Sequence, residues 1–176
     1  LKVLGILVLL VAAGIGGLFA VAATRPDTFQ VSRSLAIKAA PEKLFPLIND
    51  LRTFNSWNPF VTSDPDVKLV YSGPPSGPGA AGALGLGKGG TGTLSIVEAA
   101  PPSKVVMALD MTRPLEAQNR VEFTLRPQGD ATQVTWTMSG GLPLVGKVVH
   151  LLIDMDKMVG GQFDKGLADL KAKAER

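Results

Sequence analysis

Cysteine is absent from this chain of 176 residues, and histidine occurs once, at position 150. The lack of cysteine excludes disulfides, thiolate nucleophiles and cysteine-based metal or cluster sites. A single histidine without converging carboxylates offers no pattern for a metal site, so we expect neither a metal nor a cofactor. If residues 144–173 are helical, His150 lies on the solvent face, and a Ser-His-Asp arrangement would need it turned inward. We therefore assign no catalytic residue from the sequence.

Charged residues are also scarce, at 19% of the chain, and the formal net charge is only +3. Lysine and arginine are scattered and are not interleaved with aromatic residues, so we expect no nucleic-acid partner. Hydrophobic residues reach 45%, which is typical of a folded chain rather than a disordered one. The length suits one folded domain in addition to a membrane segment.

Apolar residues are concentrated at the N-terminus, where Val3–Ala23 forms an uncharged run of 21 residues. A helix of this length spans the hydrocarbon core of a bilayer. A secretory signal is the alternative, because Ala20-Val21-Ala22 resembles a cleavage site, although the apolar region of a signal normally covers about 7 to 15 residues. We predict a single-pass membrane anchor over residues 1–25, or an uncleaved signal, followed by one domain over residues 26–176. Four basic residues follow the span within about 20 positions and only Lys2 precedes it, which by the positive-inside tendency favours a cytoplasmic domain, although the membrane side stays open.

After this segment the chain alternates between apolar and polar residues, the pattern of strands with one buried face. The alternation runs through residues 29–38 and recurs in later runs at 67–71, 94–96, 105–111, 121–125 and 134–138. Turns rich in proline and glycine join these runs without helices between them, which indicates an antiparallel meander. Gly73–Gly92 is almost half glycine, and we expect it to be mobile or weakly paired.

Helical patterns flank the strands. Two short helices are predicted after the first strand, one opening at Pro41 and one covering Leu51 to Ser56, before an apolar turn at Trp57-Asn58-Pro59-Phe60. At the end of the chain, Leu144–Lys173 repeats apolar residues at helical spacing, and we predict one long amphipathic helix of roughly 45 Å. Gly160-Gly161 inside it costs about 1 kcal/mol per glycine relative to alanine, which favours a bend or a close backbone contact there.

Two charged residues, Arg33 and Glu98, share the parity of the buried positions in their strands. Arg33 is expected either to reach the sheet edge through a twist or bulge, or to point into a cavity that takes an acidic ligand group. Glu98 would act as an acid or base only if it were buried, and solvation at the end of its strand is the simpler expectation.

The order of these elements, with several local signatures, resembles the SRPBCC superfamily, which includes START-like and polyketide cyclase/dehydrase-like proteins. The resemblance covers about Phe29 to Glu175 and rests on motifs that include Ala40-Pro41-Glu42-Lys43-Leu44-Phe45, Trp57-Asn58-Pro59-Phe60, Thr132-Gln133-Val134-Thr135-Trp136 and Phe163-Asp164-Lys165-Gly166-Leu167. It implies an α+β helix-grip fold, in which a curved antiparallel sheet of about seven strands surrounds a long C-terminal helix, with two short helices after the first strand. The chain departs from the family at Ala83-Leu84-Gly85-Leu86, where an aromatic residue is expected.

In a helix-grip fold, the space between the sheet and the helix is the natural site for an apolar ligand. The expected lining consists of Tyr71, Met107, Leu109, Met111, Phe123, Trp136, Met155, Val159, Gln162 and Phe163. Gln162 is placed to hydrogen-bond either a ligand head group or a backbone carbonyl. Residues at these spacings also form the core of any globular protein, so a filled interior is the alternative.

Three functions fit these features. The leading expectation is a membrane-anchored START-like domain that binds a hydrophobic small molecule or lipid and contacts the membrane through residues 3–23. A cyclase-like or dehydratase-like enzyme is the second, and it requires Arg33, Glu98 or Tyr71 to point into the pocket with a perturbed pKa. A ligand-free scaffold in the cell envelope is the third, and it requires a filled interior.

Overall fold

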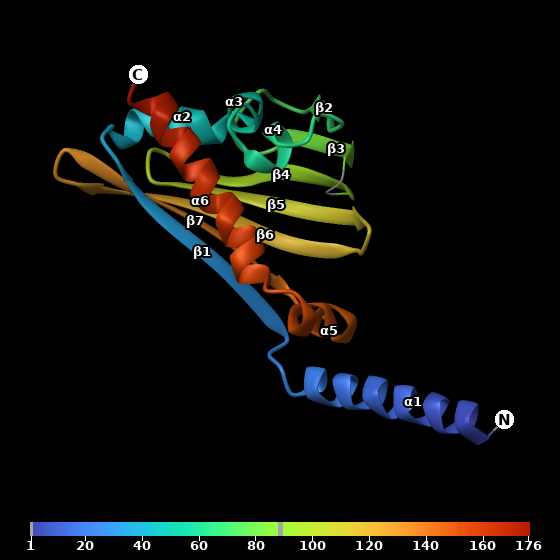
Figure 1. Cartoon of the computed structure of the whole chain (residues 1–176). Coiled ribbons are helices and arrows are strands. Elements are labelled where there is room, and N and C mark those ends of the chain that lie inside the picture. The colour runs from blue at the N-terminus through green and yellow to red at the C-terminus, as the bar shows by residue number, and fades with distance from the viewer. Residues whose placement is uncertain (1, 88–89) are drawn as a thin grey trace.

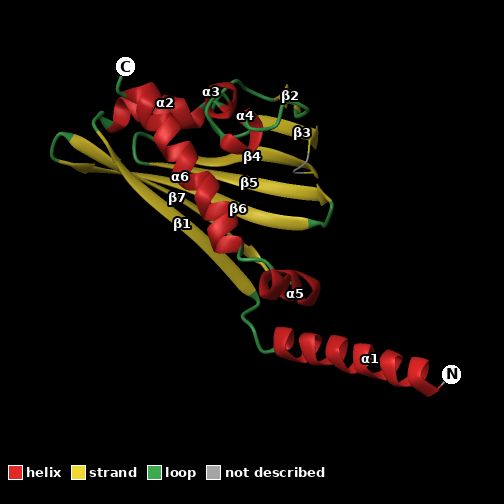
Figure 2. Ribbon diagram, in the orientation of Figure 1, coloured by secondary structure: helices red, strands yellow, loops and turns green. Residues whose placement is uncertain are grey.

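One antiparallel sheet of seven strands makes up most of the domain, and a long helix crosses its face (Figures 1 and 2). The computed structural model describes residues 2–87 and 90–176. The strands are β1 (Thr28–Ile37), β2 (Lys68–Ser72), β3 (Ala81–Gly87), β4 (Gly90–Ala100), β5 (Lys104–Arg113), β6 (Ala117–Gln128) and β7 (Ala131–Gly141). Their order is β1-β7-β6-β5-β4-β3-β2, so β2 to β7 form the predicted meander and β1 closes onto β7.

The helices lie before, within and after this sheet. They are α1 (Lys2–Ala23), α2 (Pro41–Asn49), α3 (Leu51–Asn55), α4 (Pro59–Thr62), α5 (Leu144–Leu152) and α6 (Met155–Ala174). α6 packs over β1 and β7, while α2 packs over β5 and β6, so the helices share one face of the sheet (Figure 1). This arrangement confirms the predicted α+β helix-grip fold.

The core fills the layer between the sheet and these helices. Alternating strand residues and the inward face of α6 meet there, and the side chains that are fully buried include Phe54, Met107, Phe123, Phe163 and Leu167. Burying a side chain of this size stabilises the fold by about 1.5–3 kcal/mol. The stability of the domain therefore depends on the same layer in which a ligand site was predicted.

The prediction of one continuous helix over Leu144–Lys173 is wrong, because the chain leaves the helix at Ile153 and Asp154. Ile153 is extended, with φ −126° and ψ 128°. The Asp154 side chain accepts a hydrogen bond from the Lys157 backbone N–H at 2.9 Å, which caps the start of α6. The aspartate therefore begins a second helix and separates α5 from α6.

Two further segments differ from the sequence prediction. Pro59–Thr62 forms the single turn of α4, capped by Asn58, where a plain turn was expected. Ala81–Gly87 forms β3, which pairs with β2 and β4, although the glycine-rich segment was expected to be weakly paired. The β3–β4 register is irregular between Leu84 and Gly87, and residues 88 and 89 lie outside the described residues.

α1 projects away from the domain and exposes nearly all of its side chains (Figure 1). The run Val3–Ala23 has a mean hydropathy of 2.6 and is long and apolar enough to cross a membrane. A signal sequence near the N-terminus has the same length and composition, so both interpretations of this helix fit the structure.

Candidate functional site

The strand register places two rows of residues on the face of the sheet that α6 covers. Directly paired residues of antiparallel strands point to the same face. One row joins Ile96, Met107, Val121, Met138 and Val31 from β4 to β1. The row below it crosses all seven strands through Tyr71, Gly82, Leu94, Leu109, Asn119, Gly140 and Phe29. These two rows are therefore mostly apolar, with Tyr71 and Asn119 as their polar members.

The predicted lining residues divide into a buried group and a half-buried group. The side chains in the buried group pack into the core and belong to Met107, Phe123, Trp136, Val159 and Phe163. The side chains in the half-buried group lie around that core and belong to Tyr71, Leu109, Met111, Met155 and Gln162. The structure thus brings the predicted residues to one layer, with the buried group filling its centre.

Trp136 is at the centre of this layer. Its indole stacks on the Phe163 ring, with centroids 4.2 Å apart and planes at 10°, and lies 4.8 Å from the Phe123 ring. Gly166 makes the close approach of α6 possible, because a Cβ at this position would lie 2.7 Å from Trp136 Cζ3 and 2.9 Å from Pro59 Cδ. The helix is therefore fitted closely against the tryptophan.

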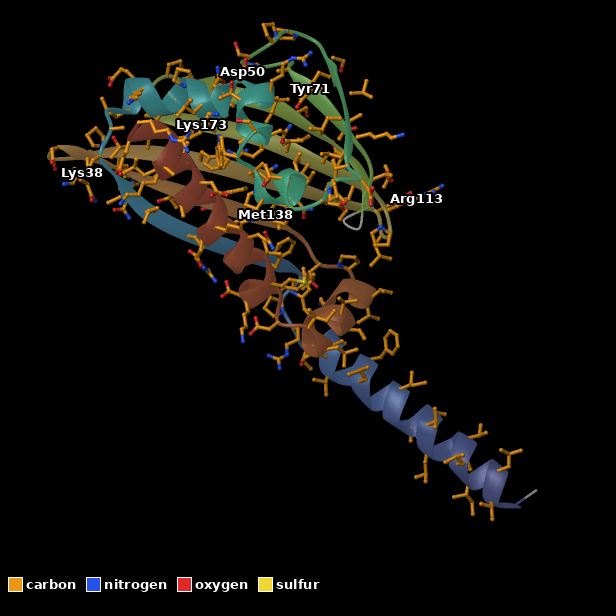
Figure 3. The ribbon with its side chains drawn as sticks, turned by 45° about the horizontal axis from the view of Figure 1, so that its top comes forward. Lys38, Asp50, Tyr71, Arg113, Met138 and Lys173 are labelled. Atoms are coloured by element: carbon orange, nitrogen blue, oxygen red, sulfur yellow. The ribbon has the colours of Figure 1, made fainter. Side chains whose placement is uncertain are left out.

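Three polar atoms in this apolar layer are buried without a hydrogen-bond partner among the described residues. They are Trp136 Nε1, Asn119 Oδ1 and Gln162 Oε1. Gln162 precedes Phe163 on α6, and Phe163 stacks on Trp136 of β7. Gln162 and Trp136 therefore lie on facing elements. Asn119 pairs with Gly140, four residues beyond Trp136 on β7, which is about 13 Å along the strand. On β7, Met138 lies between Trp136 and Gly140, beside α6 (Figure 3).

Asn119 was missed in the sequence analysis. The signal was present, because Asn119 has the same parity in β6 as Val121 and Phe123, which point into the core. Gly140 leaves the space that Asn119 occupies, since a Cβ on Gly140 would overlap Asn119 Oδ1.

The structure shows neither a bulge at Arg33 nor a free guanidinium that points into a cavity. β1 pairs with β7 in one unbroken register, so no bulge moves Arg33 to the edge. Its guanidinium instead turns up to α6 and contacts Asp156 at 2.9 Å and Asp164 at 3.3 Å. The hydrogen bond from Arg33 lowers the pKa of Asp156, and the Asp156 carboxylate raises the pKa of Arg33. This charge is already neutralised by the helix.

Glu98 lies on the outer face of the sheet, contrary to its parity with Leu94 and Ile96. A β-bulge shifts the β4–β5 register between Ile96 and Glu98 and reverses the side of every later residue. Glu98 contacts Lys104 at 2.5 Å and Arg120 at 4.0 Å, and the hydrogen bond from Lys104 lowers its pKa.

Tyr71 lies near the sheet edge farthest from β1, and its hydroxyl is already engaged. Asn55 Nδ2 donates a hydrogen bond to the Tyr71 hydroxyl at 3.3 Å. The Arg52 guanidinium carbon lies 4.3 Å from the centre of the Tyr71 ring, a cation–π arrangement. Tyr71, Arg52 and Leu51 also line a small pocket of about 160 Å³ outside the core.

His150 is half-buried, so its prediction for the solvent face is wrong. Its ring lies 5.4 Å from the Phe29 ring, and burial lowers its pKa. The reason is that α5 turns this side toward β1, where His150, Phe29, Arg25 and Lys147 line an open pocket of about 350 Å³.

A wider groove lies at the same end of the domain. It has a volume of about 740 Å³ and runs between the β5–β6 hairpin and the start of α5, with Asp110, Met111, Gln118, Leu142 and Pro143 among its lining residues. Across residues 2–87 and 90–176, no group of three or more histidine, cysteine, aspartate or glutamate side chains is arranged to hold a metal ion.

Solved structures share this architecture. The Aha1 dimer from Colwellia psychrerythraea matches with a TM-score of 0.57 and 16% identity, over 81% of this chain and 93% of that chain. A protein from Chromobacterium violaceum matches with a TM-score of 0.60 and 14% identity, over 86% of this chain and 99% of that chain. Ara h 8.0201 matches with a TM-score of 0.56 and 12% identity, over 82% and 99%. At these identities the likeness shows the fold.

The sequence itself identifies the family. No curated protein sequence is significantly similar to this chain. A family model described as polyketide cyclase / dehydrase and lipid transport matches residues 28–175, which is the region from the first residue of β1 to the end of α6. The match agrees with the SRPBCC resemblance of the sequence and with the helix-grip fold. The chain therefore belongs to the polyketide cyclase / dehydrase and lipid transport family.

Proposed function

We propose that the domain binds an elongated apolar molecule, a lipid or isoprenoid-type compound with a polar group, between the sheet and α6. The observation that carries this proposal is the set of buried polar atoms on Trp136, Gln162 and Asn119 that have no hydrogen-bond partner in the described part of the chain. Leaving such an atom unsatisfied costs about 1–3 kcal/mol, so each needs a physical reason. Few polar groups among apolar walls are typical of small-molecule sites.

The chemistry of these atoms indicates which polar group would fit. Trp136 Nε1 can only donate a hydrogen bond, and an amide oxygen of Gln162 accepts one. A hydroxyl group both accepts and donates hydrogen bonds, so a ligand hydroxyl would suit either atom. Because Asn119 lies about 13 Å further along the sheet, the apolar part of the ligand would run from Trp136 past Met138, and a second polar group that donates a hydrogen bond to Asn119 Oδ1 would end it.

Binding requires the closed interior to open. Met107, Phe123 and Trp136 are buried against one another, so a ligand must displace α6 or the side chains that it holds down. Met138 and Met155 are half-buried at this boundary, and unbranched methionines repack readily around different shapes. The non-helical break at Ile153-Asp154 would allow α6 to move without α5.

α1 is the second part of the proposed function, as a membrane anchor for the domain. Its run of 21 residues matches the thickness of a bilayer core, and nearly all of its side chains are exposed. Thr24–Asp27 connects α1 directly to β1, so the domain would stay beside a reservoir of lipid.

Native mass spectrometry tests the binding proposal. The full chain would be purified in membrane patches from its own host and released at increasing collision energy, which removes loosely bound annular lipid first. We expect one apolar molecule to remain bound to the natural chain. Gln162→Leu should lose it, whereas Gln128→Leu, which changes an exposed glutamine at the end of β6, should retain it. A chain that carries no such molecule would contradict the proposal and favour a ligand-free scaffold.

The enzyme alternative gains no support from the residues that it required. Arg33 and Glu98 are ion-paired with neighbouring side chains, and the Tyr71 hydroxyl accepts a hydrogen bond from Asn55. We therefore base the proposed function on binding alone.

A further inference from the structure

α5 has its apolar face outward. Leu144, Val145 and Leu152 fall within one third of the helix circumference and are exposed, Val145 by 55% and Leu152 by 70%. A helix that faces water carries polar residues on its outer side, and contiguous apolar patches on a protein surface mark interaction sites.

The inward face of the same helix carries its polar side chains. Lys147 is buried there, and its Nζ contacts Asp27 Oδ1 at 2.6 Å, which also lowers the pKa of Asp27. His150 packs on the same side against Phe29. Burying the Lys147 ammonium group costs free energy, and the group is tolerated because it is paired with Asp27. α5 thus carries its charge on the inward face and its leucine and valine side chains on the outward face. This amphipathicity is the reverse of that of a solvated helix.

α5 also lies where α1 leaves the domain. The two helices pack against each other, and Ala22 in the last turn of α1 is fully buried. Only Thr24–Asp27 separates α1 from β1, a link of four residues that reaches about 14 Å at most. Figures 1 and 3 show α5 beside the domain end of α1, with the sheet on the other side. If α1 spans a bilayer, α5 must lie at the surface of that bilayer.

We infer that α5 is an interfacial helix, whose outward face of Leu144, Val145 and Leu152 inserts into the surface of the bilayer that α1 spans. The inference rests on the proposed anchoring role of α1. Helices of this kind bury their apolar face about 5–10 Å into the boundary between headgroups and acyl chains. Ile153, which follows α5, and Met158 in the first turn of α6 are also exposed.

The charges around this surface do not favour one type of headgroup. Charges of both signs surround it, with Arg25 and Asp27 exposed after α1, and Lys157 exposed beside Asp154 and Asp156 at the start of α6. We therefore assign the contact to apolar insertion, which a zwitterionic membrane supports, rather than to attraction by anionic lipid.

Site-specific fluorescence tests this inference on the full chain. The protein has no cysteine, so single-cysteine variants can be labelled with an environment-sensitive dye at Val145 or Leu152. Val70→Cys on the edge strand β2 is the matched control, because Val70 is an exposed valine at the far edge of the sheet. Val11→Cys in α1 is as exposed as Val145 and reports on the anchor. Each variant would be reconstituted in phosphatidylcholine vesicles that contain a spin-labelled lipid.

We expect the dyes at Val145 and Leu152 to be quenched most by a spin label near the headgroup, and the dye at Val11 by one near the acyl end. The dye at Val70 should respond only to iodide in the water. If Val11 is quenched while Val145 and Leu152 respond to iodide as Val70 does, the inference is wrong and the anchor stands.

Two other results would also overturn the inference. Dyes at Val145 and Leu152 that are shielded from both quenchers would indicate a protein, such as a second copy of the chain, on this face. If the spin-labelled lipid does not quench the dye at Val11, α1 does not lie in the bilayer, and both the anchor proposal and the inference are wrong. Ligand binding in the interior is measured separately by mass spectrometry and does not depend on these outcomes.

Discussion

Gly160 on α6 lies directly against the guanidinium of Arg33 on β1, and a Cβ at this position would overlap the guanidinium group. The same guanidinium holds Asp156 and Asp164 on both sides of the glycine. The glycine therefore lets the helix rest on the arginine, and the two acidic residues fix the helix there. This explains one of the two adjacent glycines in α6, since Gly161 is exposed and a methyl group added to it would meet no neighbouring atom within 4 Å.

The two adjacent glycines should respond differently to alanine. Gly161→Ala should raise the free energy of unfolding by about 0.5–1 kcal/mol, because alanine favours the helix and meets no neighbour. Gly160→Ala should give no such gain, because Arg33 must move away from its acidic partners. Denaturation of the full chain in micelles, followed by the fluorescence of the two tryptophans, measures both. Equal stabilisation by the two variants would contradict the assigned contact, and Arg33→Ala should restore the gain in Gly160→Ala.

Gly166→Ala should destabilise the domain more than Gly160→Ala does. Its neighbours are the buried rings of Trp136 and Pro59, which cannot swing away as the end of an arginine can. Overpacking of this kind typically costs about 1–3 kcal/mol. The same denaturation experiment measures the loss, and an unchanged midpoint would mean that α6 does not rest closely on Trp136.

His150 should have a pKa below its usual value of 6.5, because burial disfavours the charged imidazole. The unfolded chain therefore binds the proton first as the pH falls. The stability contributed by neutral His150 is complete above about pH 6.5 and is lost as the pH falls through the folded pKa. As the only histidine, it gives one imidazole signal in an NMR titration. A pKa at or above 6.5 would contradict the half-buried position.

The carboxylates with lowered pKa values affect stability at a lower pH than His150 does. The pKa values of Asp27, Asp156 and Glu98 are lowered from ordinary values of 3.8 to 4.5, so their contributions are lost only at more acidic pH. A decline of stability that begins as the pH falls below about 6.5, before the carboxylates titrate, would therefore report on His150, and His150→Leu should reduce it. A slope that is equally steep in the variant would assign the effect to another group.

Gln162→Leu should separate stability from binding. Leucine removes a buried polar atom that has no partner within the described part of the chain, so the free energy of unfolding should stay equal or rise by about 1 kcal/mol. Ligand retention should fall at the same time, which distinguishes a binding role from simple unfolding. A variant that is both less stable and free of ligand would show that Gln162 is structural.

Most of the fold could be predicted because alternation and helical spacing report which face of an element is buried. That signal fails where side chains are absent or a residue is inserted. β3 has glycine at three of its seven positions and shows no alternation, while one extra residue after Ile96 moves Glu98 to the outer face. The break between α5 and α6 was missed because Asp154 caps a new helix within an otherwise continuous helical pattern.

The candidate site was less predictable than the fold. Spacing identified Met107, Phe123 and Phe163 as inward residues, and burial agrees, but spacing cannot distinguish a lined cavity from a packed core. The Trp136 indole stacks against Phe163 from a distant helix, and its N–H has no partner among the described residues. Only the three-dimensional structure contains that relationship.

The two tryptophans provide the most direct test of the proposed ligand site. Trp57 Nε1 donates a hydrogen bond to the Leu47 carbonyl at 2.9 Å, whereas Trp136 Nε1 has no partner among the described residues. Their indole N–H signals can be followed by NMR while the total lipid extract of the host is added to the delipidated full chain. Ligand binding between the sheet and α6 predicts that the Trp136 signal shifts to that of a hydrogen-bonded indole while the Trp57 signal stays in place. If neither signal moves across the whole extract, the interior takes no ligand and the binding proposal is wrong.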